Sequence, residues 1–248
     1  MDLPVSAPLP ERVAEAIRTR IVHGQLRPGE RITEAQVAGW LSVSNNPVRE
    51  AFYLLEQEGL LVREPRHGTY VRALDSDHVR DLYAVREALE QICYRLLVEK
   101  DALQPSDYEQ LNRCIEQETA ASAAGEIAHA VDLDLQFHDL LYERTGSEVL
   151  INLWSAIRGQ IRVLINWRNM YVADSGRRHA PPHLHHRILQ YLREGNLERL
   201  VADNKQRHVD NSAEIMQVLA SAGSVAPPKV QPGEPRALES ARPGETRH

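Results

Sequence analysis

Four side chains in the C-terminal half have the types and the spacing of a metal site. Asp134 and His138 are four residues apart, so both project from the same face of a helix. His185 and His208 lie on two later helical stretches, each in line with apolar residues. Three imidazoles and one carboxylate suit Zn²⁺, Ni²⁺, Mn²⁺ or Fe²⁺, and bundles build metal sites from facing helices. An inward histidine is also a common hydrogen-bonded core residue, so a structural role is the alternative.

A run of six helices must position these side chains. From residue 76 to about residue 220 the apolar residues recur at helical spacing, without a convincing strand. The expected helices cover residues 77–100, 106–122, 127–145, 148–171, 181–195 and 197–219, with Pro181 and Pro182 opening the fifth. The first is expected to bury the stripe Leu82, Val85, Leu89, Ile92 and Leu96. Helices in this order predict an antiparallel six-helix bundle.

The N-terminal region predicts two short helices joined by a tight turn. Thr33 and Gln36 have the spacing of a capping box, and the helix that they open is expected to end near Ser42. Ser44 stands where a second N-cap belongs, and Gly59 ends the second helix. The buried face of this second helix is expected to comprise Val48, Phe52 and Leu55.

A β-hairpin is expected to follow these two helices. Residues 60–62 and 69–71 are strand-like runs, and residues 65–68 between them form a turn-rich tip with positive charge. An earlier helix over residues 10–22 carries an apolar stripe that packs beneath. This order of elements is the layout of a winged helix-turn-helix, so the fold class is mainly α with a small β wing.

The polar residues of this region point to DNA binding. Ser44, Asn45, Asn46 and Arg49 gather at the N-terminal end of the second helix, the end that enters the major groove in helix-turn-helix proteins. The expected DNA-contacting residues are Thr33, Ser44, Asn45, Asn46, Arg49, Arg66, His67 and Gly68. The alternative is that the asparagines only cap the helix and that Arg49 is a solvated surface residue.

Composition restricts the class of protein. The net charge is −6, and residues 1–75 hold 9 Arg against 10 acidic residues, so DNA binding depends on local placement of cations at Arg49, Arg63, Arg66, His67 and Arg72. Few phosphate contacts per chain imply a dimer. Cys93 and Cys114 are isolated and are expected to be buried thiols in a reducing compartment. Without an apolar span of membrane length or a signal peptide, a cytoplasmic protein is expected.

Several motifs in residues 12–72 resemble the GntR family of bacterial transcription regulators. They are Ile21-x-x-Gly24-x-Leu26-x-Pro28-Gly29-Glu30, Asn46-Pro47-Val48-Arg49-Glu50-Ala51, Leu55-Glu56-x-Glu58-Gly59-Leu60 and Gly68-Thr69-Tyr70-Val71. The family's recognition helix typically begins Ser-Arg-Thr-Pro, whereas this chain has Ser44-Asn45-Asn46-Pro47. Since Asn prefers adenine edges and Arg prefers guanine, the operator sequence is expected to differ from the usual one.

The helical region resembles the FCD sensing domain of the FadR subgroup, in its six-helix, VanR-like branch. The resemblance implies a divalent metal, Zn, Ni or Mn, held by Asp134, His138, His185 and His208. The separation of His185 from His208 is one residue longer than the family pattern, so His186 is held as the alternate third ligand. The resemblance also implies a small organic acid as effector, with Arg86 of Val85-Arg86-x-x-Leu89-Glu90 as its carboxylate ligand. A solvated Arg86–Glu90 pair is the alternative, and Arg158, Arg162 and Arg168 are unranked candidates.

The expected organisation is a disordered N-terminus at residues 1–9, a reader at 10–74, a sensing domain at 75–220 and a disordered tail at 221–248. The expected function is a homodimeric, metabolite-responsive repressor that binds a palindromic operator in double-stranded DNA, without enzymatic activity or a membrane partner. Two alternatives are an all-helical metalloenzyme with a two-His, one-carboxylate site and a helical scaffold with a vestigial reader.

Overall fold

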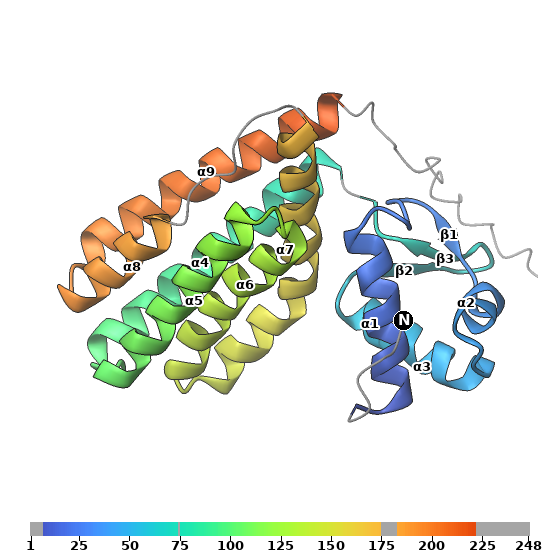
Figure 1. The fold of residues 1–248 in the computed structure, drawn as a ribbon, viewed down its shortest axis with the longest axis horizontal. Coiled ribbons are helices and arrows are strands. Elements are labelled where there is room, and N and C mark those ends of the chain that lie inside the picture. Colours follow the sequence, from blue (N-terminus) through green and yellow to red (C-terminus); the bar gives the residue numbers. More distant parts are fainter. Residues whose placement is uncertain (1–6, 74, 175–182, 222–248) are drawn as a thin grey trace, which may run out of the picture.

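The computed structural model describes residues 7–73, 75–174 and 183–221, and it contains a small α/β region beside a helical bundle (Figure 1). The α/β region, called the reader below, consists of α1 Leu9–Val22, β1 Arg31–Ile32, α2 Glu34–Leu41, α3 Asn45–Gln57, β2 Leu61–Glu64 and β3 Gly68–Val71. The bundle consists of α4 Ser76–Glu99, α5 Pro105–Ala123, α6 Ile127–Arg144, α7 Glu148–Asp174, α8 His183–Arg193 and α9 Leu197–Ser221. Residues 1–6 of the predicted N-terminal tail, Pro181, Pro182 and residues 222–248 lie outside the described residues.

The helix-turn-helix forms where its capping residues predict it. The Thr33 hydroxyl accepts a hydrogen bond from the Gln36 backbone N–H, and the Gln36 side chain accepts one from the Thr33 N–H, which completes the predicted capping box. Ser42 ends α2 in the left-handed conformation, with φ 53°. Ser44 occupies the N-cap position of α3, although its side chain makes no capping hydrogen bond. Gly59 follows α3 with φ +67°, a conformation that glycine adopts without strain.

The wing is a three-stranded antiparallel sheet in the order β1-β3-β2. The β2–β3 hairpin is confirmed, with Leu61 opposite Val71. Strand β1 was not predicted, because two residues are too short to show a strand pattern. Arg72, one of the cations predicted along the wing, is half-buried, and its Nε donates to the Gly59 carbonyl across 2.5 Å.

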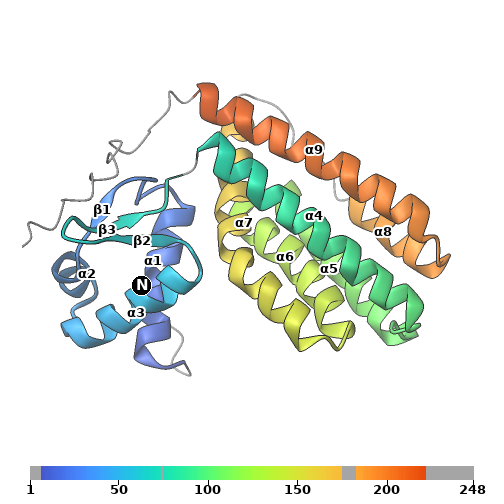
Figure 2. The same cartoon turned by 180° about the vertical axis from the view of Figure 1, so that it is seen from behind.

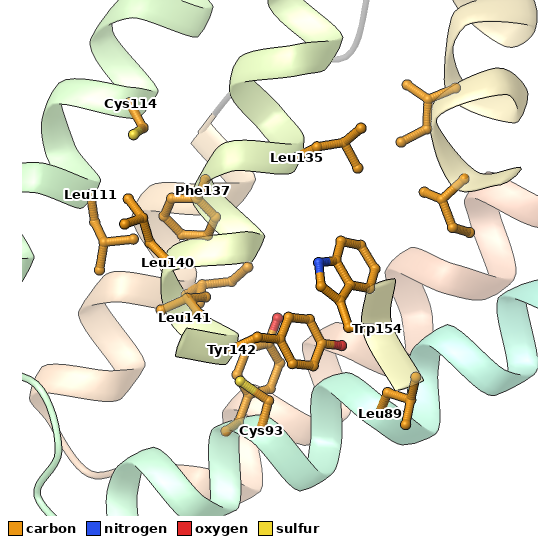
Figure 3. Packing of buried hydrophobic residues seen from close by; sticks show 14 of the residues in the cluster. Leu89, Cys93, Leu111, Cys114, Leu135, Phe137, Leu140, Leu141, Tyr142 and Trp154 are labelled. Carbon is orange, nitrogen blue, oxygen red and sulfur yellow. The ribbon is translucent and has the colours of Figure 1, made fainter. Parts of the chain in front are cut away.

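The bundle buries one continuous core that joins all six helices (Figures 1 and 2). Figure 3 shows Leu111 and Cys114 of α5 close to Phe137 of α6, with Trp154 of α7 stacked on Tyr142. Cys93 and Cys114 are both buried free thiols, as predicted. Among the described helices, none is both long and apolar enough to cross a membrane.

The predicted apolar stripe of α4 is partly wrong. Leu82 and Leu89 are buried, but Val85 and Ile92 are each 46% exposed. The face that α4 turns inward carries Arg86 and Glu90 instead, both buried. A periodicity of apolar residues alone cannot detect a buried face that contains an ion pair, which is why the stripe was assigned to the wrong side.

Candidate metal and effector site

Three of the four predicted metal ligands converge between α6 and α8. Asp134 and His138, one turn apart on α6, face His185 near the start of α8. One ligand atom from each of these residues lies within 4.8 Å of the other two. Two ligand atoms bound to one Zn²⁺ are at most about 4 Å apart, so a small closure of the group is enough to hold an ion.

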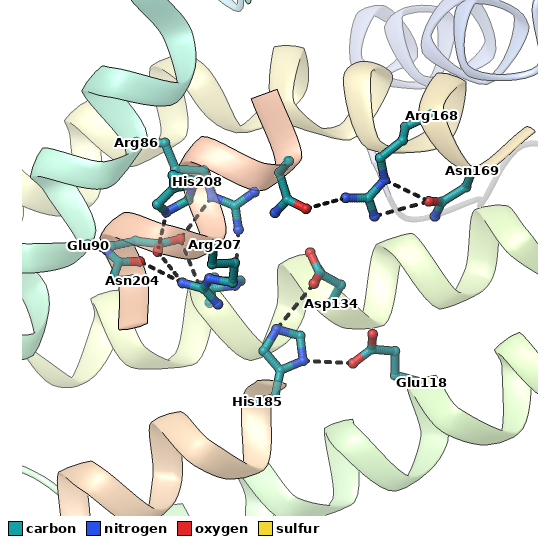
Figure 4. Close-up of polar contacts among 12 residues, drawn as sticks. Arg86, Glu90, Glu118, Asp134, Arg168, Asn169, His185, Asn204, Arg207 and His208 are labelled. Atoms are coloured by element: carbon teal, nitrogen blue, oxygen red, sulfur yellow. Dashed lines mark hydrogen bonds and ion pairs between the residues drawn. The ribbon is translucent and has the colours of Figure 1, made fainter. Parts of the chain in front are cut away.

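His185 lies between two carboxylates. Its Nδ1 is 2.9 Å from Glu118 Oε2 of α5, and its Nε2 is 3.2 Å from Asp134 Oδ1 (Figure 4). Burial lowers the pKa of His185, but the hydrogen bonds and charges of Asp134 and Glu118 outweigh it and raise the pKa to about 9. In the metal-free protein at neutral pH this imidazolium therefore occupies the place that a cation would take.

The donor set fits a divalent metal. Asp134 Oδ2 is buried and makes no hydrogen bond within the described part of the chain, so this oxygen is free to coordinate an ion. Burial and the nearby Arg86 lower the pKa of His138 well below its usual value, despite the opposing charge of Glu90, so His138 is a neutral imidazole. One carboxylate and two imidazoles are ligands that Zn²⁺, Ni²⁺ and Mn²⁺ accept.

His208 does not join this group. Its Nε2 lies 2.8 Å from Glu90 Oε2, and its ring is 5.7 Å from that of Tyr83. Its neighbour Arg207, about 100° away around α9, lines the cavity beside the three ligands instead. His186 is exposed on α8 and also lies outside the group. The structure thus brings three of the four predicted ligands together and keeps His185 over its alternate.

Arg86 is buried, which rules out the alternative of a solvated pair. Its Nε donates to Glu90 Oε1 across 2.8 Å, and its Nη2 lies 3.1 Å from His138 Nε2. Glu90 also accepts from Arg207 at 2.7 Å. Burial raises the pKa of Glu90, but the two guanidinium groups outweigh it and hold the pKa well below its usual value. The predicted effector ligand Arg86 therefore already has a carboxylate partner.

A small cavity of about 70 Å³ opens beside the three ligands. Its lining comprises Arg86, Glu118, Asp134, His138, Ile165, Arg168, Leu184, His185, Arg207 and Asn211. Arg168 of α7 donates to the side-chain oxygens of Asn169 and Asn211, and its closest carboxylate, Glu214, is 3.8 Å away (Figure 4). The Tyr83 hydroxyl is buried without a hydrogen-bond partner among the described residues. Arg168 is thus the cavity guanidinium with the least charge compensation.

The other two arginines of α7 are placed elsewhere. Arg158 forms a bidentate ion pair with Asp139, and Arg162 forms a bidentate ion pair with Asp132. Neither lines the cavity. Sequence reasoning missed Glu118 and Arg207, because a single sequence does not show which isolated polar residues of different helices meet.

Most of the predicted DNA-contacting residues are exposed on the reader. Ser44, Asn45 and Asn46 are exposed around the start of α3, and the Arg49 side chain is 62% exposed while pairing with Glu34 at 3.0 Å. Arg66 and His67 are exposed at the wing tip. Two of the predicted DNA-contacting residues also stabilise the fold. The Thr33 hydroxyl accepts a hydrogen bond in the capping box, and Gly68, with φ +116°, pairs with Glu64 in the hairpin.

Two protein families match separate parts of the chain. Residues 9–71 match the bacterial regulatory proteins of the gntR family, and residues 81–210 match the FCD domain. The chain is 30% identical to the uncharacterized HTH-type transcriptional regulator YdhC of Bacillus subtilis, over 73% of this chain and 80% of that one. It is 31% identical to the Nta operon transcriptional regulator of Aminobacter aminovorans, over 77% and 88% of the two chains.

Solved structures have the same fold. A transcriptional regulator GntR from Rhodococcus sp. RHA1 is 26% identical with a TM-score of 0.66, covering 84% of this chain and 97% of its own. Escherichia coli McbR/YncC is 22% identical with a TM-score of 0.67, covering 85% and 98%, and this likeness concerns the fold alone.

Proposed function

Because the chain belongs to the GntR family of bacterial transcription regulators and carries an FCD domain, we propose that it is a regulator whose bundle senses a small organic acid beside a divalent metal. The observation that carries the proposal is the group of Asp134, His138 and His185 at the wall of an arginine-lined cavity. The family and the relatives consist of regulators, so the chain is not an enzyme and the metalloenzyme alternative is not retained.

Asp134, His138 and His185 would hold the metal, which is Zn²⁺, Ni²⁺ or Mn²⁺. When bound, the ion supplies positive charge that attracts a carboxylate and leaves coordination positions for it, since three protein ligands do not fill its shell. Glu118 orients His185 by accepting from its Nδ1. His208 pairs with Glu90 and is not a ligand, so the proposed ligand set is Asp134, His138 and His185.

The effector is a small carboxylic acid, and Arg168 is its main protein partner. Arg86 and Arg207 both donate to Glu90, whereas the hydrogen-bond acceptors of Arg168 within the described part of the chain are amide oxygens. A carboxylate that enters the cavity gains a charge-assisted hydrogen bond from Arg168 and competes only with the long ion pair to Glu214, at 3.8 Å. The cavity volume of about 70 Å³ favours an acid of few carbon atoms.

The reader binds a palindromic operator as part of a homodimer. The exposure of Ser44, Asn45, Asn46, Arg49, Arg66 and His67 supports contact with one half-site. One chain offers few cations for phosphate contacts, and a second copy doubles them. Repression is the proposed mode, because a relative of 28% identity over 59% of this chain is the gluconate operon transcriptional repressor of Bacillus subtilis.

Elemental analysis of the purified protein tests the metal directly. We expect one divalent metal per chain in the wild type and none in the Asp134→Ala/His138→Ala variant. Operator fragments selected from random duplex DNA should then bind the wild type, and small carboxylic acids are screened for release of that DNA. Absence of metal from the wild type after incubation with Zn²⁺, Ni²⁺ and Mn²⁺ would reject the sensing assignment and leave the DNA reader standing.

A further inference from the structure

Helix α7 has two functional faces. In both views of the fold it is the bundle helix closest to the reader (Figures 1 and 2). Gly159, Val163 and Trp167 recur every four residues and form a stripe toward the reader. Ile161, Leu164 and Ile165 belong to the bundle core, and Ile165 and Arg168 line the cavity. A single helix thus contacts both the cavity and the reader.

The reader-facing stripe is tightly packed. Val163 is 4% exposed and belongs to the reader's own hydrophobic core, against which Trp167 and Ala128 also pack. The α3–β2 turn approaches so closely that a Cβ on Gly59 would meet the Gln160 side chain at 2.4 Å. Gln160 also accepts from His78 Nε2 across 2.8 Å, at the start of α4. The position of the reader is therefore set against α7 and not only through the chain connection.

A chain of charged residues crosses the same boundary. Arg162 binds both Asp132 oxygens of α6, at 2.6 and 2.8 Å, and reaches Glu15 of α1 at 3.4 Å. Arg18 then joins Glu15 to Glu58 at the end of α3, each contact at 2.6 Å. The Arg162 side chain is largely buried, and this chain of contacts connects α6 to the helix that carries predicted DNA-contacting residues.

We propose that Arg162 is the positioning residue that couples the cavity to the reader, an inference that rests on the proposed sensing function. Asp132 lies two residues before the ligand Asp134 on α6, and Arg162 lies six residues before the cavity residue Arg168 on α7. When Asp134, His138 and His185 close around a metal, α6 shifts. When an acid binds Arg168, α7 shifts. Either shift moves the Asp132–Arg162 pair, and with it Glu15 of α1.

The mechanism needs two arrangements of one packed helix. A ligand shifts an equilibrium only through different affinities for the two states. Here the difference arises because the cavity residues and the reader-facing stripe are on one helix, so a small rotation of α7 changes both surfaces together. Arg162 transmits this rotation to α1. Its planar guanidinium binds Asp132 through two nitrogens and donates from the third nitrogen to Glu15.

Hydrogen exchange of the full chain tests the coupling, with Arg162→Gln as the variant and Arg158→Gln as the matched control. Arg158 pairs with Asp139 across the same two helices, one turn earlier, and this ion pair lies within the bundle. We expect exchange of α1 amides to become roughly two- to fivefold faster in Arg162→Gln, the effect of one partly exposed ion pair, and to stay unchanged in Arg158→Gln. Equal exchange in both variants would overturn the proposal.

Glu15→Gln provides a second variant that leaves the Asp132–Arg162 pair in place. It removes the contact of Glu15 with Arg162 and also its contact with Arg18 within α1. The supporting result is therefore faster exchange in α1 that Arg162→Gln reproduces, with unchanged exchange in α6. Faster exchange throughout the bundle in Arg162→Gln, combined with no effect of Glu15→Gln, would mean that Arg162 only stabilises the fold and would reject the coupling role.

The metal alone then serves as the probe of signal transfer. In the wild type and in Arg158→Gln, Zn²⁺ should slow exchange in α6 and α8 and also change exchange in α1. In Arg162→Gln, Zn²⁺ should act on α6 and α8 only. If Zn²⁺ protects neither helix in any variant, the metal assignment fails, while the comparison without metal still decides whether Arg162 holds the reader in position.

Discussion

His185 donates its Nδ1–H to Glu118 Oε2 across 2.9 Å, and this contact determines which nitrogen of the imidazole faces Asp134. A carboxylate only accepts hydrogen bonds, so the proton stays on Nδ1 and Nε2 is directed to the metal group. Glu118 comes from α5, a helix that contributes no ligand of its own. The ligand geometry is therefore supported by a third helix.

Glu118→Gln should weaken metal binding without preventing it. The substitution removes the negative charge that makes His185 a stronger ligand. Residues that hydrogen-bond to a metal-ligating histidine contribute about 10- to 100-fold to metal affinity. Competition between the protein and a calibrated Zn²⁺ chelator measures the change. Glu116→Gln, an exposed position of the same helix, is the control and should bind Zn²⁺ like the wild type. Equal affinity in both variants would remove Glu118 from the site.

Metal affinity should rise with pH beyond the range of an ordinary histidine. The pKa of His185 is raised to about 9, because Asp134 and Glu118 outweigh the effect of burial. Zn²⁺ must displace the Nε2 proton, so its apparent affinity should increase about tenfold per pH unit from pH 6.5 to 8. A histidine of ordinary pKa would give a plateau above pH 7, and such a plateau would contradict the carboxylate pairing.

The same raised pKa predicts the pH dependence of the metal-free protein's stability. Since the folded pKa of about 9 exceeds the ordinary value of 6.5, the protonated His185 stabilises the fold fully below pH 6.5. This contribution fades as the pH rises toward 9. Urea unfolding of the metal-free wild type and of His185→Gln at pH 6 and 9 should show a larger difference between the two proteins at pH 6.

The bundle core should be sensitive to truncation at α6. Leu135 is a fully buried core residue of α6, and its replacement by Ala should lower the free energy of unfolding by about 2–5 kcal/mol. Leu153→Ala is the matched control, because its side chain is 51% exposed and its loss should cost under about 0.5 kcal/mol. Urea unfolding measures both, and similar values would argue that Leu135 is not part of the core.

Much of the fold follows from local rules that a single sequence contains. The capping box of Thr33 and Gln36, the left-handed Gly59 and the buried Phe52 each depend on neighbouring residues, and all three are as predicted. The pairing of Asp134 with His138 has the same origin, since four residues make one helical turn.

The site's remaining parts depend on how helices rotate against each other, which apolar spacing does not determine. Arg207 and His208 are adjacent, and only the packed position of α9 decides that Arg207 lines the cavity while His208 meets Glu90. Likewise, α4 turns its charged residues Arg86 and Glu90 inward, where Glu90 pairs with both Arg86 and Arg207. A pattern that assumes polar residues outside therefore misplaces Val85.

DNA recognition should depend on Asn45 and Arg49 in different ways. Asn45 is exposed at the first turn of α3, so Asn45→Ala should weaken the free energy of binding to the preferred operator by about 1–3 kcal/mol and relax the sequence preference at one position.

Arg49 is a long exposed cation, and Arg49→Ala should weaken binding to selected and random duplexes alike and lower the salt slope by about one. Selection from random DNA followed by titration at several salt concentrations measures both effects. Arg95→Ala, an exposed arginine of α4, is the control. An Asn45→Ala protein that selects the same sequence with the same affinity would assign Asn45 to capping α3.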